Sequence, residues 1–214
     1  MDIINSFNDK SSKNLLYLAK PIYGGWVTFT AHLSKKYDYP IYKITKKTEK
    51  SRRKYGYDCE YQNMCITDII KLDNLLITAV DKHYWEILPH LPPQTKIVIH
   101  DPTELKTSTK NPNPLVQNQQ CLQSFKVFTI RETVQKYLMD NFKIPSEFKI
   151  HPFYRYPCEK LGCKFHAVTI SRVDFDKNTD IILKANQLVG NSKKRVHIFG
   201  AENRLYVHHK LGEL

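Results

Sequence analysis

Four short segments place residues suited to binding phosphate or moving a proton directly after apolar runs of strand length. They contain Gly24 and Gly25, His100 and Asp101, Arg172 and Lys177, and Gly200. Glycines at the start of a helix let a ligand approach the backbone, and a helix N-terminus favours an anion. An arginine and a lysine near one strand end can both reach a diphosphate, and a histidine can act as a general base toward a hydroxyl group. The residue types therefore indicate a ligand that carries phosphate.

Each segment also has an interpretation without a ligand. The glycine pair can form a tight turn between a strand and a helix, and residues 100–102 can simply cap a strand and turn the chain. Arg172 can pair with Asp174 or Asp176 in a solvated loop. The glycine pair lacks the third glycine of a dinucleotide-binding loop, which disfavours a nicotinamide cofactor. No Asp-x-Asp motif follows a predicted strand, so we expect no bound metal ion.

These segments are positioned by an alternation of apolar runs and amphipathic patterns. The runs predict strands at residues 14–19, 41–44, 75–80, 96–99, 125–130, 148–150, 166–170 and 195–199. The patterns predict helices at residues 26–36, 84–88, 131–142 and 178–189, with another beginning near residue 202. Pro89 should stop the second helix, and residues 106–120 should form a loop. Alternating strands and helices imply an α/β fold with parallel sheets, whose ligands bind at the carboxyl ends of the strands.

A change of pattern divides the chain in two. Residues 152–164 contain two prolines and two cysteines with weak periodicity, which is typical of a linker. We expect a Rossmann-like domain over residues 1–157 and the start of a second over residues 158–214. Two strand-helix units are too few for a closed core, and the alternation is still running at residue 214. We therefore expect this second domain to be incomplete and the chain to be part of a longer protein.

The composition is that of an ordinary globular protein. The chain has 214 residues, of which 41% are hydrophobic and 25% charged. No run approaches the roughly 20 apolar residues of a membrane span, and the N-terminus lacks the pattern of a secretory signal. We expect a cytoplasmic protein, in the host cytoplasm if it is viral. The five cysteines are odd in number and lack zinc-site spacing, so we expect reduced thiols that mostly serve packing.

The net charge of +12 favours polyanionic or phosphate-bearing partners. Its densest part is the basic run, residues 46–54, where six cations accompany one acid. The cations are Lys46, Lys47, Lys50, Arg52, Arg53 and Lys54. Cations followed by aromatic side chains can hold a nucleic-acid backbone and stack its bases, as Tyr55 and Tyr57 would here. The alternative is a solvated, charged loop.

Residues 170–185 resemble the signature that opens the C-terminal domain of GT-B glycosyltransferases, in the large retaining group of that fold. The signature has an arginine after a strand and then a lysine before a helix, as at Arg172 and Lys177. Residues 196–200 resemble the following strand and its glycine, and residues 128–138 resemble a helix late in the N-terminal domain. This sequence departs from the family at two positions. Asn178 replaces the glycine after the lysine, and Arg131 replaces a serine.

The resemblance implies two Rossmann-like domains and a hexosyltransferase that uses a UDP- or GDP-sugar as donor without a bound metal or cofactor. It implies that the donor phosphates contact Gly24, Gly25, Arg172, Lys177 and Gly200. His100 would lie near the transferred sugar, where Asp101 is the carboxylate that can orient it.

The basic run would lie on the acceptor side, so Lys46, Lys47, Arg52, Arg53 and Lys54 would contact the acceptor. This acceptor would be a glycan or another hydroxyl compound, or DNA with hydroxymethylated bases that the enzyme flips out. Two other functions compete: a non-catalytic nucleic-acid-binding module that uses residues 46–54, and a sugar-nucleotide epimerase of the same fold.

Overall fold

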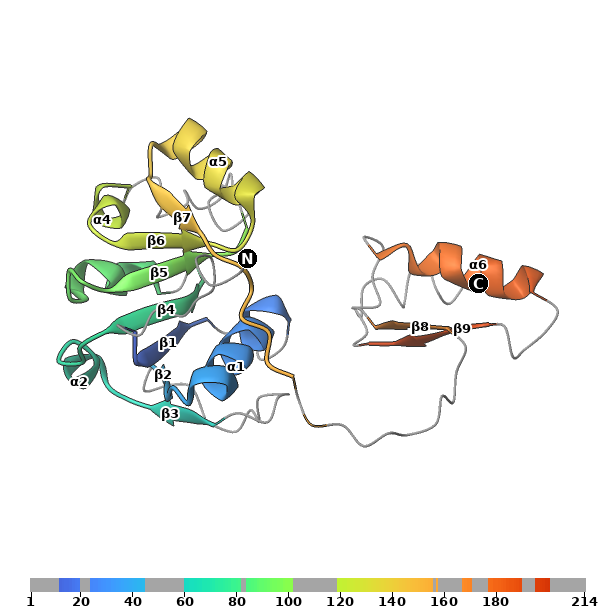
Figure 1. Cartoon of the computed structure of the whole chain (residues 1–214), viewed down its shortest axis with the longest axis horizontal. Helices are drawn as coiled ribbons and strands as arrows, with labels where there is room; N and C mark the ends of the chain where they lie inside the picture. Colours follow the sequence, from blue (N-terminus) through green and yellow to red (C-terminus); the bar gives the residue numbers. More distant parts are fainter. Residues whose placement is uncertain are drawn as a thin grey trace. The chain divides into compact units, whose positions relative to one another are not determined.

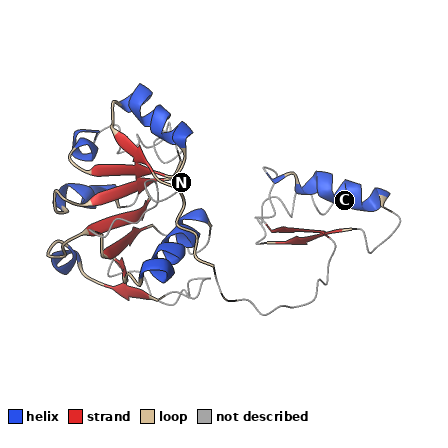
Figure 2. Ribbon diagram, viewed as in Figure 1, coloured by secondary structure: helices blue, strands red, loops and turns tan. Residues whose placement is uncertain are grey.

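The structure is a computed structural model that describes residues 12–19, 24–44, 60–81, 84–101, 119–155, 157, 167–170, 177–189 and 195–200. Contacts between residues divide the chain into two compact units, Met1–Tyr156 and Pro157–Leu214. Both units contain strands that alternate with helices (Figures 1 and 2). The chain therefore has the α/β fold that the sequence predicts.

The first unit is built on a sheet of seven parallel strands in the order β3-β2-β1-β4-β5-β6-β7 (Figure 1). The strands are β1 (Asn14–Leu18), β2 (Ile41–Lys43), β3 (Tyr61–Asn63), β4 (Leu75–Val80), β5 (Lys96–Ile99), β6 (Lys126–Thr129) and β7 (Ser146–Phe148). From β1 the chain winds outward to β3, and it then returns to β4 and winds the other way to β7. This reversal between β1 and β4 defines a doubly wound, Rossmann-like sheet.

Helices cover both faces of this sheet. They are α1 (Gly25–Tyr37), α2 (Ile66–Ile69), the 3₁₀ helix η1 (Trp85–His90), α4 (Gln119–Gln123) and α5 (Glu132–Phe142). On one face, α1 packs against β1 and β4. The buried residues of the other four helices belong to the core on the opposite face. In the described part of the chain, no helix is long and apolar enough to cross a membrane.

The strand sequences explain why both faces are covered. All six residues of β4 are buried, as expected for a central strand of a parallel sheet. Along β1, Leu16 and Leu18 belong to one core, whereas Leu15 and Tyr17 belong to the core beneath α1. Successive side chains of a strand point to opposite faces, so an uninterrupted apolar run builds two cores at once.

The second unit contains a two-stranded parallel sheet of β8 (Ala167–Ile170) and β9 (Val196–Phe199), joined through α6 (Thr179–Leu188). The side chain of Asn186 ties this helix to β9. Its amide nitrogen donates to the carbonyl of Val196, and its oxygen accepts from the Val196 N–H, both at 2.9 Å. The described part of the unit is one strand-helix-strand motif.

Three short elements were not predicted from the sequence, and the predicted ends of some strands and helices differ from the observed ones. It predicted neither β3 nor α2, and α4 contradicts the loop expected up to residue 120 because Leu122 packs into the core. β7 ends at residue 148, where the expected strand begins. The expected stop at Pro89 is wrong because Leu91 donates to the carbonyl of Leu88 in a turn. Proline fits the second position of such a turn, where its fixed φ is favourable and no N–H is needed.

Two neighbours on α5 test the described packing, since Leu138 is 0% exposed and Met139 is 47% exposed. We expect Leu138→Ala to lower the free energy of unfolding by about 2–5 kcal/mol, because it opens a cavity in the core. Met139→Ala, the matched control, should change it by less than about 0.5 kcal/mol. Urea unfolding followed by circular dichroism measures both, and equal effects would contradict the orientation of α5.

Candidate functional site

The candidate site lies at the carboxyl edge of the seven-stranded sheet. There the strands β1, β4 and β5 are parallel neighbours, so their carboxyl ends lie side by side (Figure 1). Gly24 opens the helix that follows β1, and His100 and Asp101 directly follow β5. Ligands of doubly wound sheets bind where the strand order reverses, which here is between β1 and β4. The structure thus brings two of the four predicted segments to one edge.

The start of α1 is open to a ligand. Gly24, the N-cap residue, has φ 100° and ψ −173°, a conformation that is essentially restricted to glycine. No described side chain caps this end, and the first turn has no acidic residue. Within the described residues, a Cβ atom at Gly24 or Gly25 would meet nothing within 4 Å. The first N–H groups of a helix have no acceptor inside it, so this end suits an anion.

His100 is held in a defined position and is only 6% exposed. Its Nε2 donates to the carbonyl of Thr78 at 2.7 Å, and its ring packs edge-on against Phe29 with 4.8 Å between ring centroids. A carbonyl can only accept, so Nε2 carries the proton and Nδ1 carries the lone pair when the ring is neutral. The contact with Thr78 therefore fixes the tautomer of His100.

Thr78 is the extra residue of a β-bulge in β4. Opposite it on β1, Leu16 pairs with Ile77 and the next residue, Tyr17, pairs with Ala79. A bulge leaves one residue without a partner in the ladder and bends the strand locally. This irregularity lies where the carbonyl of Thr78 meets His100.

The same threonine connects the histidine to α1. The hydroxyl groups of Thr78 and Thr30 are 2.7 Å apart, and Thr30 donates to the carbonyl of Trp26, also at 2.7 Å. Trp26 lies in the first turn of α1, next to the glycine pair. A set of buried and partly buried polar contacts therefore joins the start of α1 to His100.

Burial changes the acid–base chemistry of His100. The pKa falls from its usual 6.5 to about 4, chiefly because burial disfavours the charged ring. The bond to Thr78 opposes this fall, whereas the nearby His151 and Arg131 add to it. At neutral pH the ring is uncharged and weakly basic. The environment favours a hydrogen-bonding role toward a ligand over proton abstraction, which is more efficient when the pKa lies near the working pH.

Arg131, the N-cap residue of α5, ties together the loops that follow β5 and β6. Its Nη2 donates to the carboxylate of Asp101 at 2.5 Å and to the carbonyl of His100 at 2.6 Å, while its Nε donates to the same carbonyl at 3.2 Å. The sequence marks Arg131 only as a departure from the GT-B signature that the chain resembles. A cation directly after an apolar run was the available signal, since the same signal selected Arg172.

Two more histidines lie near this edge and were not predicted. The ring of His151 is 5.3 Å from Phe29 and 5.6 Å from His32, and His32 accepts a hydrogen bond from the backbone N–H of Tyr154 at 2.8 Å. Burial is the largest cause that lowers the pKa of both histidines. These aromatic rings extend the site from His100 along α1.

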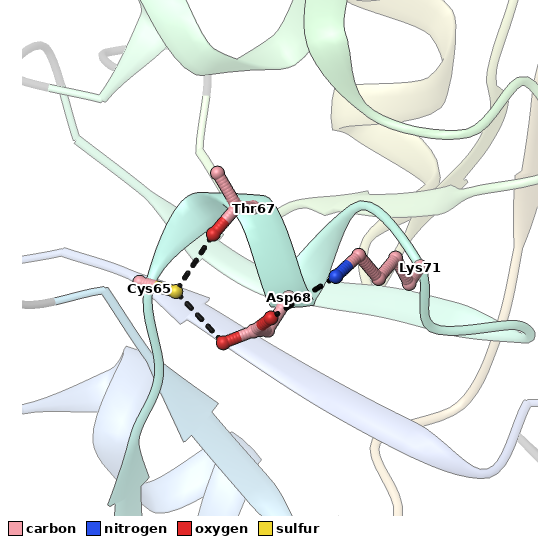
Figure 3. A network of polar contacts seen from close by, with 4 residues as sticks. All are labelled: Cys65, Thr67, Asp68 and Lys71. Atoms are coloured by element: carbon pink, nitrogen blue, oxygen red, sulfur yellow. Dashed lines mark hydrogen bonds and ion pairs between the residues drawn. The ribbon is translucent and has the colours of Figure 1, made fainter.

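A second polar group lies at the start of α2, beyond the carboxyl end of β3 (Figure 3). The thiol of Cys65 donates to the carboxylate of Asp68 at 2.8 Å and lies 2.9 Å from the hydroxyl of Thr67. Bonds from Cys65 and then Lys71 lower the pKa of Asp68. Both Cys65 and Cys121 are free, but Cys65 is exposed, so the expected packing role applies only to Cys121. Cys59, Cys158 and Cys163 lie outside the described residues.

The other predicted site residues belong to the second unit or to parts of the chain without a description. Lys177 precedes α6 and Gly200 directly follows β9, and both are exposed. Outside the described residues lie Lys46, Lys47, Arg52, Arg53, Lys54 and Arg172. Within the described ranges, no three or more histidine, cysteine or acidic side chains are arranged to hold a metal ion.

Comparisons of this chain with protein-family models, with curated protein sequences and with solved structures found no match. A Rossmann-like sheet supports many functions, so function has to be argued from the site.

Nuclear magnetic resonance can test the state of His100 directly. We expect its ring nitrogens to show the neutral Nε2–H form at pH 6 and to titrate near the pKa of about 4. Since the pKa is lower in the folded protein than in the unfolded chain, this histidine favours folding above about pH 6.5. That contribution is lost as the pH falls toward 4. His100→Gln assigns the signal, and titration near pH 6.5 would contradict the buried position.

Proposed function

We propose that this chain is part of a GT-B-type glycosyltransferase that moves a sugar from a UDP- or GDP-sugar to a hydroxyl acceptor. The observation that carries the proposal is the open start of α1 at the edge where the winding of the sheet reverses. In the described part of the chain, Gly24 and Gly25 leave space there and no side chain caps the helix. This is the place where doubly wound sheets bind phosphate-bearing ligands.

The reaction class agrees with the distribution of cations. Breaking the bond between sugar and nucleotide leaves negative charge on the departing diphosphate, so an enzyme gains rate by stabilising that charge. In this proposal the positive end of α1 is suited to that charge in the first unit, and Arg172 and Lys177 are the suited cations of the second unit. Lys177 lies exposed just before α6.

The backbone at Asn178 supports the resemblance at a position where this sequence departs from the family. Asn178 directly follows Lys177 and has φ 53° and ψ 35°, which is the left-handed region. Glycine adopts that conformation freely, and asparagine is among the few other residues that visit it routinely. The asparagine thus keeps a backbone conformation that the glycine of the signature would supply.

His100 would contact a hydroxyl group of the sugar or the acceptor. Its proton is on Nε2 and engaged by Thr78, so Nδ1 is the atom that can accept a hydrogen bond. Asp101 contributes by holding Arg131, which in turn holds the backbone of His100. His100 and Asp101 would thereby orient a substrate whose phosphate groups are bound by the other residues of the proposed site.

Gly25 offers a test that separates ligand binding from folding. Gly25→Ala adds a methyl group where nothing lies within 4 Å, so the fold should keep its stability or gain up to about 1 kcal/mol. The same methyl group would occupy the space of a phosphate, so affinity for a nucleoside diphosphate should fall by about tenfold or more, equal to about 1.4 kcal/mol. Calorimetry measures the affinity, and thermal unfolding measures the stability. An unchanged affinity would contradict the proposal that the phosphate binds at this position.

Titration of the protein with UDP, GDP and ADP, followed by assays with the matching sugar nucleotides, tests the proposed function itself. We expect one diphosphate to bind selectively and Arg172→Ala and Lys177→Ala each to weaken it by about tenfold, since each removes a charge-assisted contact. Lys184→Ala is the matched control, because Lys184 is exposed on α6 about two turns from Lys177. If folded protein binds none of the diphosphates and transfers no sugar, the proposal is wrong.

A further inference from the structure

Residues 149–155, called the strap below, leave β7 and run past α1 (Figure 1). Aromatic contacts hold the strap on this helix. The ring of His151 packs edge-on against Phe29, at 5.3 Å between centroids. Phe153 lies 5.8 Å from His32 and 4.5 Å from His151. The strap is thus attached to α1 through two histidines and two phenylalanines.

A hydrogen bond between the strap and α1 requires a neutral histidine. The backbone N–H of Tyr154 donates to Nδ1 of His32 at 2.8 Å. A ring nitrogen accepts a hydrogen bond only through its lone pair, and both nitrogens of a charged imidazolium are donors. Protonation of His32 at Nδ1 would therefore replace this bond with two opposed donors.

Protonation of His151 is unfavourable for a different reason. Its Nδ1 is buried and has no hydrogen-bond partner among the residues that the structure describes. A proton there would bury a charged N–H group without an acceptor, which is more costly than leaving a neutral nitrogen unpaired. The ring centroids of His151 and His32 are 5.6 Å apart, so a charge on either histidine also opposes a charge on the other.

We propose that His32 and His151 make the strap an acid-sensitive attachment, which is held on α1 while both rings are neutral and released when they are protonated. The inference is independent of the proposed glycosyltransferase activity, since it uses only contacts within the first unit. The strap ends just before the boundary between the units, which follows Tyr156. Its release would detach from α1 the residues that directly precede this boundary.

Several other charged groups lie on the elements that carry or face the two histidines. Toward the sheet, His151 faces His100, which is itself near Arg131 and Asp101. Within α1 the adjacent cations are Lys35 and Lys36, and within the strap they are Lys149 and Arg155. Lys149 pairs with Glu147. Among the charged groups, the one that lowers the pKa of His151 is His32 itself.

The direction of the pH effect follows from the pKa values. Burial lowers the pKa of His32 and of His151 below the usual 6.5, and the charge of His32 lowers that of His151 further. A histidine that binds its proton less tightly in the attached state stabilises attachment fully above about pH 6.5. This stabilisation is lost as the pH falls through the lowered pKa values, by up to about tenfold in the equilibrium per pH unit for each histidine.

Amide hydrogen exchange of the full chain between pH 7.5 and pH 5 tests the strap. We expect the protection factor of the Tyr154 amide to fall by about tenfold or more per pH unit below about pH 6.5. The amides of β4 in the core report any general unfolding, and their protection should stay well above that of Tyr154 over the same range, although the loss of the His100 contribution lowers it as well. Constant protection of Tyr154 while His32 becomes protonated would overturn the proposal.

Two variants separate the histidines from other effects of acid. Glutamine is uncharged at every pH. In His32→Gln, the part of the acid-induced fall in Tyr154 protection (the pH step) that His32 causes should therefore disappear, whether or not the glutamine amide replaces the hydrogen bond. His90→Gln, in the exposed part of η1, is the control and should keep the step. If His32→Gln exposes the core amides, His151→Phe keeps the aromatic packing and should make the step shallower. A step that is unchanged in both folded variants would also overturn the proposal.

Discussion

One extra residue in the central strand β4 determines how the carboxyl edge of the sheet is arranged. The bulge at Thr78 places a carbonyl where His100 can donate to it and a hydroxyl where Thr30 of α1 can meet it. A regular ladder would use backbone groups only between neighbouring strands. The bulge instead joins a helix, a central strand and the loop after the next strand through side chains, and the rigidity of the candidate site depends on that junction.

The junction also sets the chemical character of the site. Burying an imidazole favours its neutral form, and the fixed tautomer determines which nitrogen can meet a ligand. Arg131 holds the same histidine through its backbone carbonyl, so the ring and the main chain are constrained separately. The edge therefore combines an open helix end, suited to a negative group, with a neutral hydrogen-bonding ring. Such a combination suits a ligand that has both phosphate and hydroxyl groups, which is the chemistry of a nucleotide-sugar.

The sequence predicts the fold better than the site, for a physical reason. The six-residue run of β4 and the period of α5 are local patterns, and a parallel sheet places the ends of its strands at one edge, so His100 and Gly24 could be selected from the sequence alone. The bulge cannot be predicted from local patterns, since it depends on the register of β1 against β4. Arg131 meets His100 across 31 residues, and Tyr154 meets His32 across 122 residues. Such contacts follow from the tertiary fold and leave no periodic signal.

Helix α1 takes part in both the candidate anion site and the attachment of the strap. Its first turn forms the open end beside β1, and His32 lies seven residues after Gly25, about two turns along the same helix. A helix of this length moves as one body, so a shift of its position reaches both ends. If an anion at the first turn changes the proton affinity of His32 by some factor, thermodynamic reciprocity requires that protonation change the affinity for the anion by the same factor. The helix would then report the acidity of its surroundings to the ligand, with no separate regulatory domain.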